Sequence, residues 1–310
     1  MTSEATTNLS KFIGLGIVVV AVLVTAVILL NAKSNNTVSP SPKSEMEKQW
    51  QGFDSQFWYL PDDDMLGFVE VPEGEFLMGS DPAIDRNAYE NERWSDRLRR
   101  GRVELNQYYI SRFEVTVAQF NAFVIANNYS IDERALVNPG DFPVTYVTLM
   151  DALAYCRWLD AQMRAGERIP KMLSDKLTQG WHITLPNEAQ WEKAARGPEG
   201  RIYPWGNQAT TTFANFGSDS LRGVGSKPCP ACAYGLADMS GNVWELTQSF
   251  YLPYPFVKDA HPKLEDDALF VMRGGSYRDS DNNVRAAVRG GIDPGVRNEA
   301  IGFRLVLSQP

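Results

Sequence analysis

GLADMSGNVWELT, residues 235–247, is a short segment in which small residues surround two carboxylates and a tryptophan. Asp238 and Glu245 supply the carboxylates, and the backbone carbonyls of Gly241 and Val243 lie between them in sequence. Hard cations such as Ca²⁺ prefer carboxylate and carbonyl oxygens that a tight turn brings together. We therefore expect a structural calcium site at these four residues. The alternative is a turn capped by Asp238, with the tryptophan packed into the core.

On both sides of this segment the chain alternates short apolar runs with Gly, Pro, Asn and Asp. Period-two alternation favours strands at residues 68–71, 76–80 and 103–116. Apolar residues at helical spacing favour helices at residues 117–128, 148–166 and 185–196. Residues able to cap a helix start stand at Thr116, Thr148 and Asn187. After Arg196 regular structure is scarce, so we expect an irregular, loop-rich α+β domain over residues 66–310.

The N-terminal part carries an apolar run without a charged side chain, FIGLGIVVVAVLVTAVILL, at residues 12–30. As a helix this run would span roughly 28 Å, close to the hydrocarbon thickness of a bilayer. The alternative is a cleaved signal peptide, whose apolar region is ordinarily shorter. We interpret the parts in order as a short tail, a transmembrane signal anchor, a flexible linker and an aromatic lead-in: residues 1–11, 12–30, 31–48 and 49–65.

Cysteine is sparse, with 3 residues in the chain: Cys156, Cys229 and Cys232. The last two form CPAC, a spacing that suits a loop disulfide, a redox pair or half of a zinc site. A zinc site requires four ligands, and the chain has only 2 histidines to complete one. In an exported domain we favour a small disulfide between Cys229 and Cys232. Two free thiols and a redox-active pair are the alternatives.

Eight spaced motifs follow one another along the soluble part: VPEGEFLMGS (71–80), FEVTVAQFNAF (113–123), FPVTYVTLMDALAYCRWL (142–159), ITLPNEAQWEKAAR (183–196), YPWGN (203–207), GLADMSGNVWELT (235–247), RGGSY (273–277) and IGFRLV (301–306). Together and in this order they resemble the formylglycine-generating enzyme, or sulfatase-modifying factor, family. The resemblance implies an irregular α+β fold related to C-type lectin-like domains. Members of that family include oxidases that convert a cysteine to formylglycine, non-haem iron sulfoxide synthases and non-catalytic binding modules.

The resemblance also implies where metal ions would lie. It supports calcium at the four residues of the 235–247 segment and suggests a weaker second calcium site at Asn215 and Phe216. In the resembled oxidases, two cysteines follow GGSY, five residues apart, and hold copper as thiolates. Asp279 and Val284 occupy the matching positions here, and neither is a good ligand for Cu(I).

The iron-dependent members require a histidine cluster, for which 2 histidines are too few. We therefore expect no copper, no iron and no catalytic residue of the family's kind. Leu305 stands where the partner of Cys156 lies in some members, so we expect Cys156 to be reduced and buried.

We call Asp279 and Val284, which stand in place of the two cysteines, the vacated positions. Arginine, asparagine and aspartate residues lie on both sides of them in the sequence. Their guanidinium forks and amides suit a polar recognition surface for a peptide, protein or glycan. The candidate residues are Tyr277, Arg278, Asp279, Asp281, Asn282, Arg285, Arg289 and Arg297. The alternative is a set of solvated loops with internal Arg–Asp pairs, each of which contributes little.

These features predict a membrane-anchored, exported and non-catalytic module, a pseudoenzyme that binds an envelope protein or peptide in the periplasm or another extracytoplasmic space. The formal net charge of −8 argues against nucleic acid as a partner, because phosphate binding requires a basic face. One alternative is a divergent oxidoreductase of the same family that modifies a protein or a small molecule. A weaker alternative is thiol–disulfide exchange at CPAC.

Overall fold

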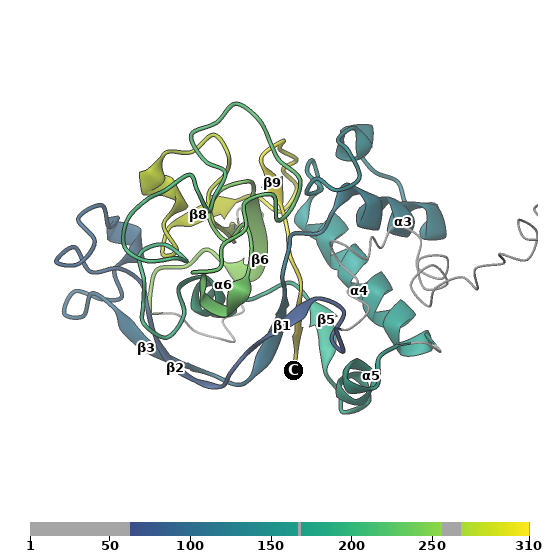
Figure 1. The fold of residues 1–310 in the computed structure, drawn as a ribbon, viewed down its shortest axis with the longest axis horizontal. Coiled ribbons are helices and arrows are strands. Elements are labelled where there is room, and N and C mark those ends of the chain that lie inside the picture. The colour runs from purple at the N-terminus through teal and green to yellow at the C-terminus, as the bar shows by residue number, and fades with distance from the viewer. Residues whose placement is uncertain (1–62, 167–168, 256–267, 310) are drawn as a thin grey trace, which may run out of the picture. The chain divides into compact units, whose positions relative to one another are not determined.

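Short strands from distant parts of the chain meet in the sheets that organise the fold (Figure 1). The computed structural model describes residues 63–166, 169–255 and 268–309. One four-stranded antiparallel sheet runs, in spatial order, through β1 (Phe68–Val71), β4 (Tyr108–Ser111), β10 (Val306–Ser308) and β5 (His182–Thr184). Strand β10 thus lies between two strands from much earlier in the sequence. The sheet forms only when the N-terminal and C-terminal parts of the domain come together.

A second four-stranded sheet carries the segments that position the candidate site. Its spatial order is β8 (Arg289–Ile292), β7 (Phe270–Arg273), β6 (Trp244–Phe250) and β9 (Ile301–Gly302). Its neighbours are antiparallel except for the parallel pair β6 and β9. Regular structure after Arg196 is scarce, as expected, but the short strands found there form a sheet that the sequence did not predict. The apolar pattern is weak there because the strands are short and their pairing is interrupted by a register shift between Leu246 and Phe250.

A separate hairpin, β2 (Gly74–Met78) with β3 (Gly101–Leu105), confirms the early strand predictions together with β1 and β4. The connection between its two strands, residues 79–100, includes the 3₁₀ turn η1 (Glu90–Glu92). In Figure 1 this connection forms the left edge of the domain, on the side opposite the helices.

The predicted helices are confirmed as α3 (Val117–Asn127), α4 (Leu149–Ala165) and α6 (Glu188–Arg196). Each begins with a capping box, in which the first residue and the third helical residue satisfy each other's backbone amides. The pairs are Thr116 with Gln119, Thr148 with Asp151, and Asn187 with Gln190. The sequence did not predict α5 (Lys171–Thr178), an eight-residue helix with a mostly charged and polar sequence.

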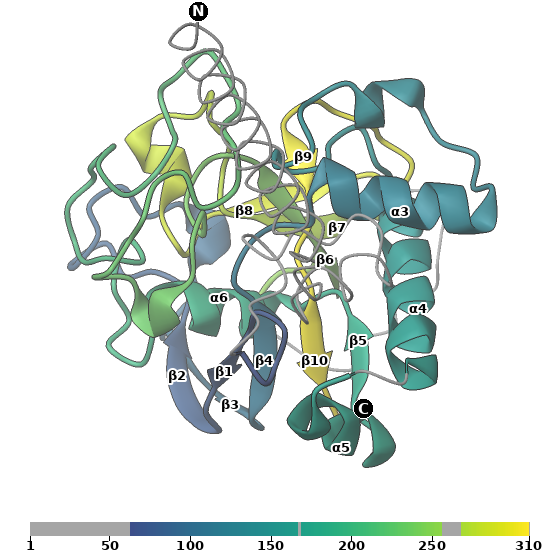
Figure 2. The ribbon, with the colours of Figure 1, turned by 45° about the vertical axis from the view of Figure 1, so that its right-hand side comes forward.

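Helices α3, α4 and α5 lie on one side of the domain and loops fill the other (Figures 1 and 2). Phe120, Tyr155 and Phe303 pack in the larger core cluster, where the two helices α3 and α4 meet the end of the chain. Trp191 of α6 lies in a second buried cluster together with residues of β2 and β4. Cys156 is a free, buried cysteine on α4, as expected.

The expected tail, anchor and linker and most of the aromatic lead-in lie outside the described residues. Within the described part, no helix combines the length and apolar character needed to cross a bilayer.

Candidate functional site

The loop that follows β7 is fixed by its glycines. Gly274 and Gly275 adopt φ angles of 96° and 72°, which side chains rarely tolerate. A Cβ on Gly275 would lie 2.6 Å from the carbonyl oxygen of Asn283, at the far end of the same loop. The double glycine therefore lets the two limbs of the loop approach closely, and it sets the positions of the residues between them.

Asp279, at the first vacated position, turns its carboxylate into this loop. Its Oδ2 accepts hydrogen bonds from Trp244 Nε1 at 2.9 Å and from the backbone N and Oγ of Ser276 at 2.9 and 2.6 Å. Its Oδ1 accepts one from Asn283 Nδ2 at 3.2 Å. Asp279 thus joins the loop to β6, which corrects its assignment to a recognition surface: its oxygens are already used within the protein.

Val284, at the second vacated position, is fully buried. It ends the 3₁₀ turn η4 (Asp281–Val284) and packs in a small apolar cluster with Tyr203, Ala214 and Phe216. An aliphatic side chain in such a cluster stabilises the loop by leaving water. The two positions that hold thiolates in the resembled oxidases are thus used here for hydrogen bonding and packing.

Arg285 and Arg289 are buried, which also contradicts their assignment to a recognition surface. Arg285 donates to Asp85 at 2.6 Å and to both carboxylate oxygens of Glu92 at 2.7 and 2.9 Å. Arg289 makes a two-pronged pair with Glu188 at 2.5 and 2.8 Å. A buried guanidinium requires a paired carboxylate, and these partners lie far earlier in the chain, where the sequence pattern gave no sign of them.

Arg273 completes this network from the end of β7. It donates to Glu192 of α6 at 2.5 Å and to Glu188 at 3.2 Å. Burial alone would raise the pKa of Glu192, but the positive charges of Arg273 and Arg196 outweigh it and lower that pKa. The network therefore holds the Glu192 carboxylate ionised and ties the loop that follows β7 to α6.

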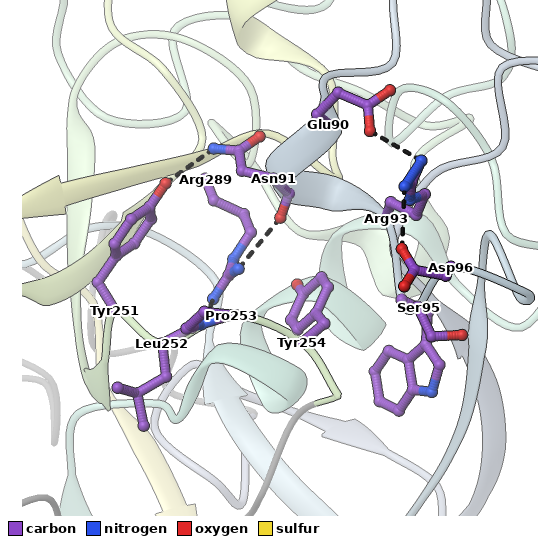
Figure 3. A pocket seen from close by; sticks show the side chains of 11 residues that line it. Glu90, Asn91, Arg93, Ser95, Asp96, Tyr251, Leu252, Pro253, Tyr254 and Arg289 are labelled. Atoms are coloured by element: carbon purple, nitrogen blue, oxygen red, sulfur yellow. Dashed lines mark hydrogen bonds and ion pairs between the residues drawn. The ribbon is translucent and has the colours of Figure 1, made fainter.

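Arg289 also borders a cavity of about 470 Å³ (Figure 3). Its guanidinium lies between the rings of Tyr251 and Tyr254, 5.0 and 4.0 Å from their centroids. Arg93, on the opposite side, pairs with Glu90 and Asp96. The charged groups around this cavity are thus engaged with one another.

The other surface candidates differ in exposure. Tyr277 is only 4% exposed, and Arg297 is partly buried against Asp151 and the carbonyl of Tyr146. Arg278 and Asp281 are exposed and Asn282 is half-buried. Because most of the arginines turn inward, the accessible surface is smaller and less charged than the sequence predicted.

A second cavity, of about 360 Å³, lies beside the loop and includes Tyr277. Its lining combines aromatic, aliphatic and polar side chains: Arg134, Val137, Asn138, Phe142, Tyr146, Ser220, Leu221, Tyr277 and Glu299. We call it the Tyr277 pocket. Apart from Tyr277, the sequence analysis missed these residues. The available signal was the FPVTYVT motif, which contains Phe142 and Tyr146 but was used only to recognise the family.

Charges at the rim of the Tyr277 pocket are paired. The Arg134 guanidinium lies 4.4 Å from the centre of the Tyr146 ring and binds Asp132. Tyr146 donates its hydroxyl to Glu299 at 3.3 Å, and Glu299 also pairs with Arg278. The pocket therefore has aromatic walls and a nearly neutral polar rim.

The expected calcium ligands only partly suit a cation. Glu245 is buried and receives both prongs of Arg304 at 2.6 Å and Trp191 Nε1 at 2.7 Å, so its charge is already neutralised. Asp238 accepts a hydrogen bond from Gly225 N at 2.6 Å. The buried carboxyl group of Glu114 lies beside it and forms a hydrogen bond with the Asp238 side chain.

The two acids Glu114 and Asp238 interact with each other. Burial and the neighbouring Asp238 raise the pKa of Glu114 well above its usual value. Burial also raises the pKa of Asp238, to about 6. The described residues contain no group of three or more His, Cys, Asp or Glu arranged to hold a metal ion. The carboxyl groups that a cation could engage beside this turn are thus those of Asp238 and Glu114, after loss of their protons, rather than that of Glu245.

The weaker second calcium site is not assembled from free side-chain oxygens. Asn215 Oδ1 accepts from Ser218 Oγ at 2.8 Å, and its amide donates to Ser220 and Asn242. Phe216 packs beside Val284. Cys229 and Cys232 form a disulfide, the arrangement that the sequence favoured.

A family model and two curated relatives show which proteins this chain is similar to. The family described as "Sulfatase-modifying factor enzyme 1-like domain" matches residues 60–309. The chain is 30% identical to hercynine oxygenase of Mycolicibacterium smegmatis over 76% of its own length, and it spans 60% of the length of that relative. It is 26% identical to inactive C-alpha-formylglycine-generating enzyme 2 of Bos taurus, covering 77% of this chain and 87% of that one.

Solved structures agree on the fold. PvdO from Pseudomonas aeruginosa superposes with a TM-score of 0.62 at 22% identity, covering 77% of this chain and 93% of that one. Treponema denticola variable protein 1 gives a TM-score of 0.58, also at 22% identity, over 77% of this chain and 94% of that one.

Proposed function

The chain belongs to the family of sulfatase-modifying factor enzyme 1-like domains, and on that premise we propose that it is a non-catalytic binding module of the cell envelope. The main support for the proposal is that Asp279 and Val284, at the two vacated positions, have structural roles within the protein. Asp279 accepts four hydrogen bonds within its loop and Val284 is fully buried. Neither side chain is left to hold a redox metal.

The Tyr277 pocket is the binding site of this proposal, in place of the wider arginine surface. Its walls are aromatic and its rim charges are satisfied in pairs. Desolvated aromatic groups contribute most of the affinity in many protein interfaces, whereas paired rim charges contribute little. The occupant is an extended segment of an envelope protein or peptide that inserts an apolar side chain between Phe142, Tyr146 and Tyr277.

A metal and oxygen test separates this proposal from a divergent oxidoreductase, which the similarity to hercynine oxygenase favours. The full chain is incubated with Cu(I) or Fe(II) and a cysteine-containing peptide, and bound metal and oxygen uptake are measured. We expect neither stoichiometric metal nor oxygen uptake. The double variant Asp279→Cys/Val284→Cys serves as the control, because it restores two thiols and with them a means of binding Cu(I). Oxygen-dependent turnover by the unchanged chain would establish the oxidoreductase.

A crosslinking test addresses the pocket. A photoreactive amino acid replaces Val137, which lines the pocket and is 77% exposed, or Met172 of α5, an exposed position outside the pocket lining, as the matched control. In native membranes we expect a crosslinked partner from position 137 that is lost in the Tyr146→Ala background. Equal products from both positions, or products that survive Tyr146→Ala, would place the binding site elsewhere.

Membrane anchoring by residues 12–30 and export of the domain are part of the same proposal. Their support is the apolar run and the Cys229–Cys232 disulfide, since such bonds persist mainly in oxidising compartments. We expect the full chain to resist carbonate extraction from membranes, and the domain to be digested by protease added outside the inner membrane. Release by carbonate, or protection from protease, would contradict the anchor or the export respectively.

Calcium is proposed as a structural ion at Asp238, with Glu114 rather than Glu245 as the second carboxylate. The support is the close approach of two buried carboxyl groups, whose burial raises the pKa of both acids. An ion that binds only the folded state raises the melting temperature. We expect calcium to raise it relative to EGTA, and Glu114→Gln to remove the response, whereas the exposed control Asp219→Asn keeps it. An unchanged melting temperature would exclude the ion.

A further inference from the structure

Five arginines lie within ten residues, RWSDRLRRGR at 93–102, in a chain whose formal net charge is −8. We call residues 93–102 the arginine turn. Two of its arginines have carboxylate partners: Arg93 pairs with Glu90 and Asp96 (Figure 3), and Arg102 pairs with Glu75. Among the described residues, no carboxylate forms an ion pair with Arg97 or Arg99, and both are exposed. Arg100 is half-buried and interacts with Asp81 and Glu192 inside the domain. The turn is therefore a local excess of positive charge.

The backbone of the arginine turn is held in one shape. Trp94 N donates to Arg99 O at 2.9 Å, and Ser95 N donates to Leu98 O at 2.8 Å. Ser95 Oγ accepts from Leu98 N at 3.0 Å. These bonds close a tight turn with residues 96 and 97 at its tip, so the exposed arginines are presented from a fixed backbone rather than from a disordered tail.

Trp94 fixes the base of the arginine turn. Its ring lies against the backbone of Gly101, where a Cβ would come within 1.9 Å of the ring. The Trp94 ring also packs against the ring of Tyr254, with 5.3 Å between the ring centroids. The packing of Trp94 thus attaches the base of the arginine turn to the body of the domain.

Apolar side chains accompany the charges. Leu98, between Arg97 and Arg99, is 59% exposed, and Ile84 of the same β2–β3 connection is 52% exposed. This connection forms the left edge of the domain in Figure 1, away from α3, α4 and α5. Exposed leucine or isoleucine beside arginine is typical of surfaces that lie in the boundary between lipid headgroups and acyl chains.

An anionic bilayer fits this combination better than a nucleic acid or an acidic protein does. Unpaired arginines bind the phosphates of lipid headgroups, and an exposed leucine gains by entering the acyl region. Nucleic acid also carries phosphates, but it offers no apolar phase for Leu98. We propose that the arginine turn, with Leu98 beside its tip, docks on the phosphate headgroups of an anionic lipid bilayer. This surface is separate from the Tyr277 pocket and does not depend on what that pocket binds.

The test compares the full chain in nanodiscs of neutral phosphatidylcholine with discs containing about one third phosphatidylglycerol. Hydrogen–deuterium exchange of peptides covering the arginine turn is measured in both. We expect slower exchange in the anionic discs, and loss of the difference at high salt, because salt screens exposed charges. Each arginine near an anionic surface contributes roughly a fivefold gain in binding. Arg97→Gln/Arg99→Gln therefore lowers docking on the order of 25-fold, and Leu98→Ser lowers it further.

The matched control is Arg157→Gln/Arg222→Gln, which removes two exposed arginines outside the turn and keeps the same net charge as the test variant. It is expected to retain the protection. Equal exchange in neutral and anionic discs would overturn the proposal. Protection that survives Arg97→Gln/Arg99→Gln would also overturn it, since lipid would then contact another surface. A melting temperature equal to that of the unchanged chain shows that these exposed substitutions leave the fold intact.

Discussion

At the residue scale, Asp279 and Val284 have structural roles in the loop that follows β7. The carboxylate of Asp279 satisfies the indole N–H of Trp244 and two groups of Ser276. Val284 fills an apolar cluster. Asp279 thus provides hydrogen-bond acceptors and Val284 provides apolar packing. Both stabilise the loop that begins at Gly274 and Gly275.

Removal of the Asp279 carboxylate tests this structural role. Asp279→Ala leaves the Trp244 and Ser276 donors unpaired in a partly buried loop, and unpaired buried donors cost about 1–3 kcal/mol. We expect the free energy of unfolding to fall by that amount in urea titrations. Asp279→Asn keeps acceptor capacity and should lose less. Asp219→Ala, at an exposed position, is the control and should change stability little.

The buried pair Glu114 and Asp238 predicts a pH dependence, measured in EGTA. Burial raises the pKa of Asp238 to about 6 in the folded state, above the value of about 4 in the unfolded chain. The folded state therefore holds its proton to higher pH than the unfolded state, so stability falls as pH rises from about 4 to about 6.

Asp238→Asn removes this titration while an amide oxygen can still accept from Gly225 N. We expect its free energy of unfolding, measured by urea titration across that pH range, to decline less with rising pH than that of the unchanged chain. Identical slopes for the two proteins would show that Asp238 titrates normally.

At the scale of the elements, local signals predicted the helices well. Capping residues and apolar spacing lie within a few positions of one another, so Thr116, Thr148 and Asn187 marked three helix starts correctly. The sheet β8-β7-β6-β9 was not predicted, because its short strands pair across large sequence distances. The candidate site was predicted in part for the same reason. The loop and its two vacated positions follow from a motif, but the carboxylates that bury Arg285 and Arg289 do not.

The capping box of α4 supplies a prediction at this scale. Thr148→Ala removes the acceptor for Asp151 N, whose hydrogen bond measures 3.1 Å. Loss of an N-cap typically costs about 1 kcal/mol, and we expect a fall of that size in the free energy of unfolding by circular dichroism. Met150→Ala, at a 57% exposed position on the same helix, is the control. Equal effects of the two substitutions would mean that the cap contributes nothing specific.

At the scale of the whole molecule, buried arginines join segments that are far apart in the chain. Arg273 and Arg289 join β7 and β8 to α6 through Glu188 and Glu192. Arg304 joins the end of the chain to β6 through Glu245. In a loop-rich domain with short strands, ion pairs of this kind supplement the backbone ladders that hold distant segments together.

Arg285 offers the clearest test, because it joins the β2–β3 connection to the loop that follows β7 through buried Glu92 and Asp85. Arg285→Met leaves two carboxylates without their cation, and breaking a buried pair from one side costs about 3–5 kcal/mol. Arg285→Met/Glu92→Gln removes one of those charges and should recover part of the loss. Unfolding followed by intrinsic tryptophan fluorescence measures both variants, with exposed Arg157→Met as the control. A cost for Arg285→Met no larger than that of the control would mean that water reaches the carboxylates and that the pair does not hold the two segments together.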